Sequence, residues 1–198
     1  MSVDFQSSQT KENLMRAFAG ESQARNRYTF AAGEAVKQKQ HMIADVFLFT
    51  ANQEKEHAQI FYKHLKELSG QNICVDGTYP VDISEDVVSL LRSAHHNEYE
   101  EYEDVYQKFS SIASEEGFTK VAQDFKNIAE IEKIHGDRFE QLANMLESGE
   151  LYVSNVKCQW MCLNCGHIYE GTQVPERCPV CDHDQGYFIH LELAPYTK

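Results

Sequence analysis

The sequence Glu-Lys-Glu-His at residues 54–57 recurs 78 positions later as Glu-Lys-Ile-His at residues 132–135. Each copy places a glutamate and a histidine three residues apart, which puts both side chains on one face of an α-helix. A single copy would usually be a surface pair. Both copies lie on apolar helical stripes, however, so we expect them to point into a helical core where each pair can contact one metal ion.

Apolar residues recur at alternating spacings of three and four along most of the first 149 residues, which is typical of helices in a bundle. The stretch at 69–82 collects glycines and a proline and predicts a long connection between two helix pairs. The predicted helices lie near 10–37, 41–69, 84–115 and 118–147.

Every predicted helix carries a glutamate on its apolar stripe at about mid-length. Buried, unpaired glutamates are costly and normally become protonated, so several at one level require cations. Glu21 and Glu98 are 77 positions apart, so the two halves repeat as helix pairs that each supply one Glu and one Glu-x-x-His, as in di-iron bundles. The candidate metal-binding side chains are Glu21, Glu54, His57, Glu98, Glu101, Glu132 and His135.

Glu101 breaks this internal repeat, because Ala24 occupies the matching position in the first half. The extra carboxylate predicts two chemically unequal metal ions. Tyr28 and Tyr106 follow Glu21 and Glu98 by about two helical turns. Either phenol could be a core aromatic or a hydrogen-bond donor to a ligand carboxylate or a bound oxygen species.

Past residue 150 the helical pattern stops, and four cysteines form two Cys-x-x-Cys motifs separated by 12 residues. Four thiolates make a tetrahedral site for iron or zinc, and the spacing does not decide between these metals. We therefore predict two domains, a bundle over 1–150 and a metal-binding domain over 151–198. The metal-binding cysteines are Cys162, Cys165, Cys178 and Cys181, whereas Cys74 and Cys158 are expected to be free thiols.

The composition excludes several classes of function. The formal net charge of −13 argues against a nucleic-acid partner, which would need clustered Lys and Arg. No apolar run approaches the roughly 18 residues of a membrane span, and the N-terminal residues lack the pattern of a secretory signal. We expect a cytoplasmic protein without a membrane partner, in which clustered cysteines bind metal rather than form disulfides.

The order of these motifs resembles the rubrerythrin family. Glu, Glu-x-x-His, Glu-x-x-Glu and Glu-x-x-His are followed by Cys-x-x-Cys-Gly and Cys-Pro-x-Cys, and the likeness includes Ala-Phe-Ala-Gly-Glu-Ser-Gln-Ala at 17–24 and Trp-Met-Cys-Leu-Asn-Cys-Gly at 160–166. The resemblance covers nearly the whole chain. It implies a mainly α protein with a ferritin-like four-helix bundle that binds two non-haem irons. A small rubredoxin-like domain of short strands and knuckles would follow, with one iron (FeS4), for which zinc can substitute.

The resemblance also implies an oxidoreductase, namely a di-iron peroxidase that reduces hydrogen peroxide to water in the defence against oxidative stress. Electrons would come from NAD(P)H through a separate rubredoxin-type reductase and enter at the four-cysteine centre. The seven Glu and His candidates would be iron ligands, with Glu54 and Glu132 bridging. His57 and Glu101 would exchange at one iron as its redox state changes. The family further suggests a homodimer in which the tail of one subunit faces the bundle of the other.

Some features leave alternatives open. Ala-His-His-Asn at 94–97 departs from the small residues of the family, and Glu100 and Glu103 form a competing Glu-x-x-Glu. The chain could instead be a ferroxidase or iron-handling bundle with a structural tail, or its tail could be a zinc ribbon that docks a partner protein. Only the peroxidase hypothesis explains why a one-electron site is joined to a two-iron site. Colour separates the alternatives, because a ferric tetrathiolate centre is red and zinc is colourless.

Overall fold

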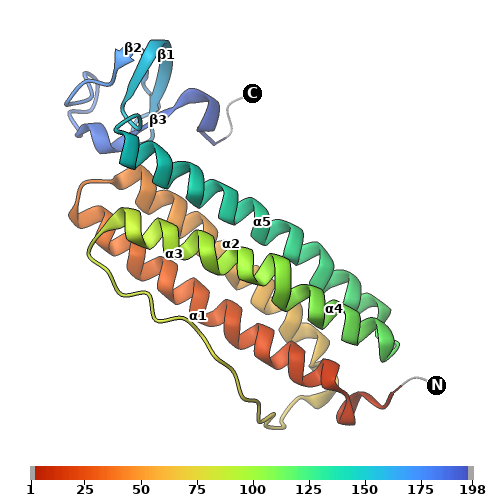
Figure 1. The fold of residues 1–198 in the computed structure, drawn as a ribbon. Coiled ribbons are helices and arrows are strands. Elements are labelled where there is room, and N and C mark those ends of the chain that lie inside the picture. The colour runs from red at the N-terminus through yellow and green to blue at the C-terminus, as the bar shows by residue number, and fades with distance from the viewer. Residues whose placement is uncertain (1–2, 196–198) are drawn as a thin grey trace.

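Four long helical segments lie side by side in the computed structural model, which describes residues 3–195 (Figure 1). A small β-sheet lies at one end of the bundle. This arrangement confirms the predicted mainly α architecture with a small C-terminal sheet. The helices are α1 (Gln9–Lys37), α2 (His41–His64), α3 (Val87–Glu100), α4 (Tyr106–Glu115) and α5 (Thr119–Ser148).

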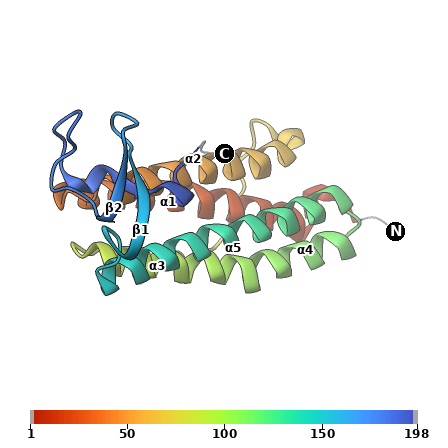
Figure 2. The same cartoon turned by 90° about the horizontal axis from the view of Figure 1, so that it is seen from above.

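Two of the predicted helices differ from the observed ones. The helix expected over 41–69 ends at His64. The helix expected over 84–115 begins at Val87 and contains a π-helical turn, Glu101–Val105, which separates α3 from α4. Figure 2 shows α3 and α4 end to end along one line with α5 beside them, so the turn interrupts the helix without redirecting it.

The bundle core consists of two apolar clusters with a polar layer between them. One cluster is centred on Phe47, Leu91 and Phe139. The other surrounds Phe61 and Phe125. These five side chains are fully buried. Four of the mid-helix glutamates predicted from the sequence lie between the two clusters and are at most 2% exposed to solvent, namely Glu21, Glu54, Glu98 and Glu132.

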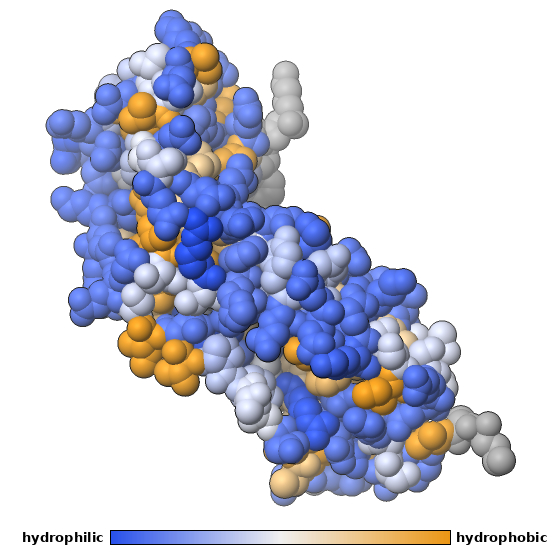
Figure 3. Space-filling view, in the orientation of Figure 1, coloured by the Kyte–Doolittle hydropathy of each residue, from blue (hydrophilic) through white to orange (hydrophobic). Residues whose placement is uncertain are grey.

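The connection between α2 and α3 has an extended course along the outside of the bundle (Figure 1). We call residues 71–86 the strap. It is attached to α1 by ion pairs of 2.8 Å from Arg16 to Asp76 and from Arg27 to Asp82. The Tyr79 hydroxyl also donates a hydrogen bond of 2.9 Å to the Arg16 carbonyl oxygen. The space-filling view of this face is mainly hydrophilic, with apolar side chains in small, separate patches (Figure 3).

The C-terminal sheet is antiparallel, with strand order β2-β1-β3. Trp160 and Phe188 are fully buried in its small core, which three of the four clustered cysteines join or contact. Within residues 3–195, no helix combines the length and the apolar character that crossing a membrane requires. The strands are β1 (Val153–Cys162), β2 (Ile168–Gln173) and β3 (Phe188–His190).

The C-terminal part is fixed to the corner between α1 and α2. The rings of His41 and Tyr187 stack with centroids 4.1 Å apart, and the Tyr152 hydroxyl donates a hydrogen bond of 2.5 Å to Gln40. Gly186 comes so close to this corner that a Cβ atom would lie 1.7 Å from the carbonyl oxygen of Lys39. Only glycine permits this contact between two backbones.

We therefore expect Gly186→Ala to destabilise the protein by about 1–3 kcal/mol, because the overpacked contact must open. Urea denaturation should show the loss, and limited proteolysis should show faster cleavage near residues 149–152. Gly33→Ala is the control, since a Cβ there meets nothing within 4 Å. Equal stability of the two variants would contradict the prediction.

Candidate metal centres

Six of the seven predicted Glu and His ligands come together at mid-bundle, from α1, α2, α3 and α5. Each is at most 5% exposed to solvent, although all six are ionisable. They form two groups of four, within each of which the ligating atoms all lie within 4.8 Å of one another. The two groups are Glu21, Glu54, His57 and Glu132, and Glu54, Glu98, Glu132 and His135.

Each group is centred on one histidine. His57 Nδ1 lies 2.9 Å from Glu132 Oε1 and 3.3 Å from Glu54 Oε2. His135 Nδ1 lies 2.8 Å from Glu132 Oε2 and 3.0 Å from Glu54 Oε1. Glu54 and Glu132 therefore turn one oxygen toward each histidine. This is the arrangement that two carboxylates need to bridge two ions.

The potential ligand atoms are better satisfied by metal ions than by hydrogen bonds to one another. Both oxygens of Glu132 and the Nδ1 atoms of both histidines are buried without a hydrogen-bond partner in the described part of the chain. So is one oxygen each of Glu21, Glu54 and Glu98. Such an orphaned polar atom costs about 1–3 kcal/mol, and more when it is charged. Carboxylate oxygen and imidazole nitrogen suit iron, which would satisfy these atoms together.

The pKa values of the buried glutamates and histidines also indicate a metal site. Burial raises the pKa of Glu21 well above its usual range, and the Glu132 carboxylate adds to the effect. Burial and the Glu54 carboxylate do the same to the pKa of Glu98. Burial lowers the pKa of His135, but the surrounding carboxylates, Glu132 first, outweigh it and raise the pKa to about 12. Without cations the cluster can stay buried only by retaining protons.

Two tyrosines hold the outer carboxylates. The Tyr28 hydroxyl on α1 donates a hydrogen bond to Glu98 Oε1 on α3, and the Tyr106 hydroxyl on α4 donates one to Glu21 Oε1 on α1. Both phenols are thus hydrogen-bond donors as well as core aromatics. On the outer side of the cluster, the Nε2 atom of His135 lies 3.1 Å from Gln53 Oε1. Sequence reasoning missed Gln53, because an isolated glutamine carries no motif.

Glu101 lies to one side of the six. It is half-buried, and it lines a cavity of about 510 Å³ between the strap and helices α1, α3 and α4. Burial raises the pKa of Glu101 well above its usual range, and the nearby Glu132 carboxylate raises it further. The competing pair, Glu100 and Glu103, is exposed, which favours Glu98 and Glu101 as the residues that face the cluster.

The π-helical turn explains an irregularity in the repeat. Tyr28 follows Glu21 by seven residues, whereas Tyr106 follows Glu98 by eight. A π turn adds one residue to a helix and often occurs at a functional site. The extra residue lies within Glu101–Val105, so the unpaired glutamate begins the turn. The eight-residue spacing was the sequence signal for it.

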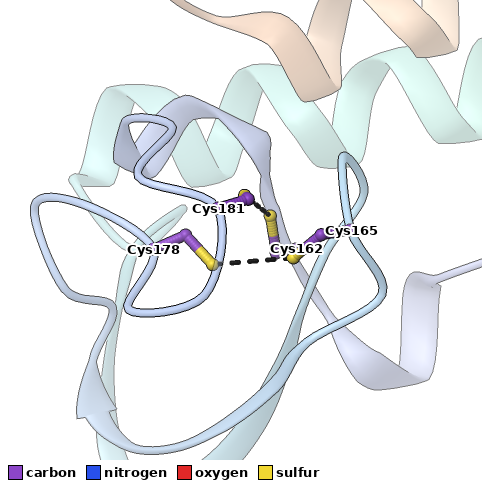
Figure 4. Close-up of side chains that lie close together, drawn as sticks. All are labelled: Cys162, Cys165, Cys178 and Cys181. Atoms are coloured by element: carbon purple, nitrogen blue, oxygen red, sulfur yellow. Dashed lines mark hydrogen bonds between the residues drawn. The ribbon is translucent and has the colours of Figure 1, made fainter.

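The side chains of the four clustered cysteines point toward one another in the C-terminal part of the chain (Figure 4). The Sγ atoms of Cys162 and Cys181 are 3.8 Å apart, and those of Cys165 and Cys178 are 3.7 Å apart. All four sulfurs lie within 4.8 Å of one another, as a single tetrahedral ion requires. Cys74 and Cys158 are not part of this group.

The two knuckles share one backbone design. Gly166 and Asp182 each lie four residues after the first cysteine of their motif and have a positive φ, of 77° and 59°. Each donates its N–H to the carbonyl oxygen of that cysteine. The turns aim backbone N–H groups at sulfur, and the N–H of His183 lowers the pKa of the Cys181 thiol to about 6. At Cys181 this contact favours the thiolate, the form that binds metal, whereas burial raises the pKa of the Cys162 thiol to about 12.

Comparison with known proteins agrees with this geometry. The chain matches a family model described as rubrerythrin over residues 12–143 and one described as the rubredoxin-like domain of rubrerythrin over residues 160–189. A curated rubrerythrin of Clostridium perfringens is 43% identical over 180 residues, which cover 90% of this chain and 92% of that relative.

Solved structures agree as well. Fully reduced, all-ferrous nigerythrin has a TM-score of 0.63 and 29% identity, covering 96% of this chain and 88% of that chain. The bacterioferritin of Desulfovibrio desulfuricans has a TM-score of 0.62 and 23% identity over 71% of this chain and 81% of that chain, which shows a shared fold. These likenesses confirm the ferritin-like bundle and the rubredoxin-like tail predicted from the sequence.

The raised pKa values predict how the stability of the metal-free protein depends on pH. The unfolded chain releases the protons of Glu21 and Glu98 near pH 4.5, whereas the folded protein retains them to a higher pH. The raised pKa of His135 acts in the same direction above pH 6.5. The free energy of unfolding should therefore fall as pH rises from about 5 to 8. Urea denaturation across this range is the measurement. Iron-loaded protein, the control, should respond less because the cations compensate the carboxylates. Greater stability of the metal-free protein at the higher pH would contradict the prediction.

The shared position of Glu132 predicts a difference in metal content. Glu132→Ala should reduce bundle iron from two per chain toward one or none, because both groups lose a ligand. His57→Ala should reduce it less, since His57 belongs to one group. Metal analysis after loading is the measurement, with Glu130→Ala, an exposed glutamate of the same helix, as control. Two irons retained in Glu132→Ala would refute the bridging role.

Proposed function

The chain belongs to the rubrerythrin family, and from this we propose that it is a non-haem di-iron peroxidase that reduces hydrogen peroxide to water in oxidative-stress defence. The observation that carries the proposal is the sharing of Glu54 and Glu132 between two buried groups, one around each histidine. The cofactors of this family, two irons in the bundle and one iron at four cysteines, fit the two donor sets of the chain.

Peroxide reduction consumes two electrons and two protons and releases two water molecules. When bound, the bundle irons would supply both electrons together, and the four-cysteine iron would restore them one at a time. The chain supplies the surroundings. Glu54 and Glu132 hold the two sites at a fixed separation, and the apolar clusters on either side exclude water that would weaken the electrostatics.

The remaining residues have distinct proposed roles. Tyr28 and Tyr106 fix the orientation of Glu98 and Glu21 through their hydrogen bonds. Glu101 is the one member of the seven that lines the cavity, so its carboxyl faces a peroxide that enters there. We assign Glu21, Glu54, His57, Glu98, Glu101, Glu132 and His135 as the ligands of the di-iron site, and the four clustered cysteines as those of the FeS4 site.

We further propose that an NAD(P)H-dependent rubredoxin-type reductase delivers electrons at the four-cysteine site. Cys165 is exposed, so a donor protein can approach that edge closely. None of the six cysteines forms a disulfide, in keeping with the reducing cytoplasm in which we place the protein. We keep the division into domains at 1–150 and 151–198, since α5 ends at Ser148 and β1 begins at Val153.

A homodimer would shorten the path between the two centres. His135 precedes the end of α5 by 13 residues, so roughly 20 Å of helix lies between it and the start of the tail. Phe49 on α2 and Ile134 on α5 are 50% and 56% exposed beside the cluster. We propose that this apolar face packs against a second copy, whose four-cysteine site then lies nearer to the cluster than the chain's own.

Cys162→Ser tests the electron-entry role. The variant should lose the red colour and peroxide reduction driven by NADH and reductase, while circular dichroism shows an intact bundle. Cys74→Ser is the matched control, because Cys74 lies exposed in the strap. Full donor-driven turnover in Cys162→Ser would exclude this role. If the purified wild-type protein is colourless, contains only zinc at the four cysteines and does not reduce peroxide, the zinc-ribbon alternative is favoured.

A further inference from the structure

The cavity under the strap reaches the cluster from outside. Glu101 and Tyr106 both line it, and the Tyr106 hydroxyl is bonded to Glu21, a member of the first metal group. The outer wall of the cavity is formed by the strap, from Asp76 to Pro80. A solute that enters beneath the strap therefore arrives at the Glu101 side of the carboxylates.

The cavity is narrow at Gly20, one residue before Glu21 on α1. A Cβ atom at this buried glycine would lie 3.6 Å from Cε1 of Tyr79 and 4.0 Å from Oε1 of Glu101. The strap tyrosine and the carboxylate thus meet across a glycine. Both distances are ordinary van der Waals contacts, so alanine would fit here without strain, but its methyl group would occupy the space between them.

Tyr79 is held firmly in this position. Its hydroxyl donates to the Arg16 carbonyl oxygen, while the Arg16 side chain binds Asp76 of the strap. A Cβ at Gly77 would lie 2.9 Å from the Tyr79 hydroxyl oxygen, so a side chain there would push the ring away. Two glycines therefore flank the Tyr79 ring.

The basic side chains around the cavity are already paired. The three basic residues in its wall are Arg16, Arg27 and Lys108, and each contacts an acidic partner: Asp76, Asp82 and Asp104, respectively. Paired cations attract an anionic solute weakly. The wall therefore suits a small neutral molecule, and a hydroperoxide is neutral at pH 7.

We propose that this cavity is the entry path for hydroperoxides and that Gly20 and Tyr79 set its size limit at the place where the strap approaches Glu101. The inference rests on the proposed peroxidase function. Hydrogen peroxide and short alkyl hydroperoxides pass, and bulky aromatic hydroperoxides do not. The reaction that follows is the same for each: the O–O bond breaks, two electrons come from the reduced protein, and two protons convert ROOH into ROH and water.

Gly20→Ala and Gly33→Ala form a matched pair for testing the passage. Both glycines lie inside α1, and both have room for a methyl group. Alanine is the better helix former, so both variants should melt at a higher temperature than the wild type. Only Gly20→Ala should lose kcat/KM for hydrogen peroxide, by several-fold and with iron content unchanged. Equal kcat/KM in the two variants would overturn the proposal.

Tyr79→Ala tests the size limit. Removal of the ring should raise the ratio of kcat/KM for cumene hydroperoxide to that for hydrogen peroxide by several-fold. Tyr79→Phe keeps the ring and should restore the wild-type ratio. A ratio that is the same in all three proteins would show that Tyr79 does not select the substrate.

A chemical readout is independent of turnover. Glu101 can be labelled in the full-length protein with a water-soluble carbodiimide and glycine ethyl ester, and the label can be located by peptide mass spectrometry. The carbodiimide exceeds the proposed size limit, so labelling should be slow in the wild type and in Gly20→Ala and clearly faster in Tyr79→Ala. Identical rates would refute the path even in an active enzyme. If the wild type reduces no peroxide but labelling follows this order, the peroxidase function fails and the passage stands.

Discussion

The burial of charged groups at the centre of the bundle is the constraint on which the rest of the structure depends. Six ionisable side chains occupy a layer between two apolar clusters. Ions of one sign cannot be concentrated in such a medium unless ions of the opposite sign accompany them. The stability of the bundle is therefore coupled to its metal content. The two phenols and Gln53 complete it by fixing groups that metal alone would leave free to rotate.

Much of this could be predicted from the sequence, because periodicity reports which face of a helix a residue occupies. The spacing of apolar residues along the helices located Glu54 and His57, and the Cys-x-x-Cys spacing located the group of four cysteines. Contacts between distant segments leave no such trace. Nothing in the sequence placed Tyr79 of the strap beside Gly20, and nothing showed that Gly186 touches the corner between α1 and α2. These features depend on how whole elements pack, which local pattern does not encode.

The π-helical turn falls between these two cases. Its extra residue was visible as an eight-residue spacing from Glu98 to Tyr106, but only the structure showed that the helix absorbs it locally. The turn absorbs the extra residue while α3 and α4 remain collinear. The second helix pair therefore still matches the first helix pair on both sides of the turn. The turn also places Glu101 at the cavity, where the first half has Ala24 inside the core. One inserted residue thus makes one side of a nearly symmetric site open to the outside.

The crossed tyrosines have a consequence for how such a chain can arise. Tyr28 of the first helix pair bonds to a glutamate of the second pair, and Tyr106 of the second bonds to a glutamate of the first. If the repeat descends from one duplicated hairpin, the ancestral hairpin could have formed these bonds only with another copy of itself. Gene fusion would then have joined two partners that were already mutually dependent, and the strap would be the seam of that fusion.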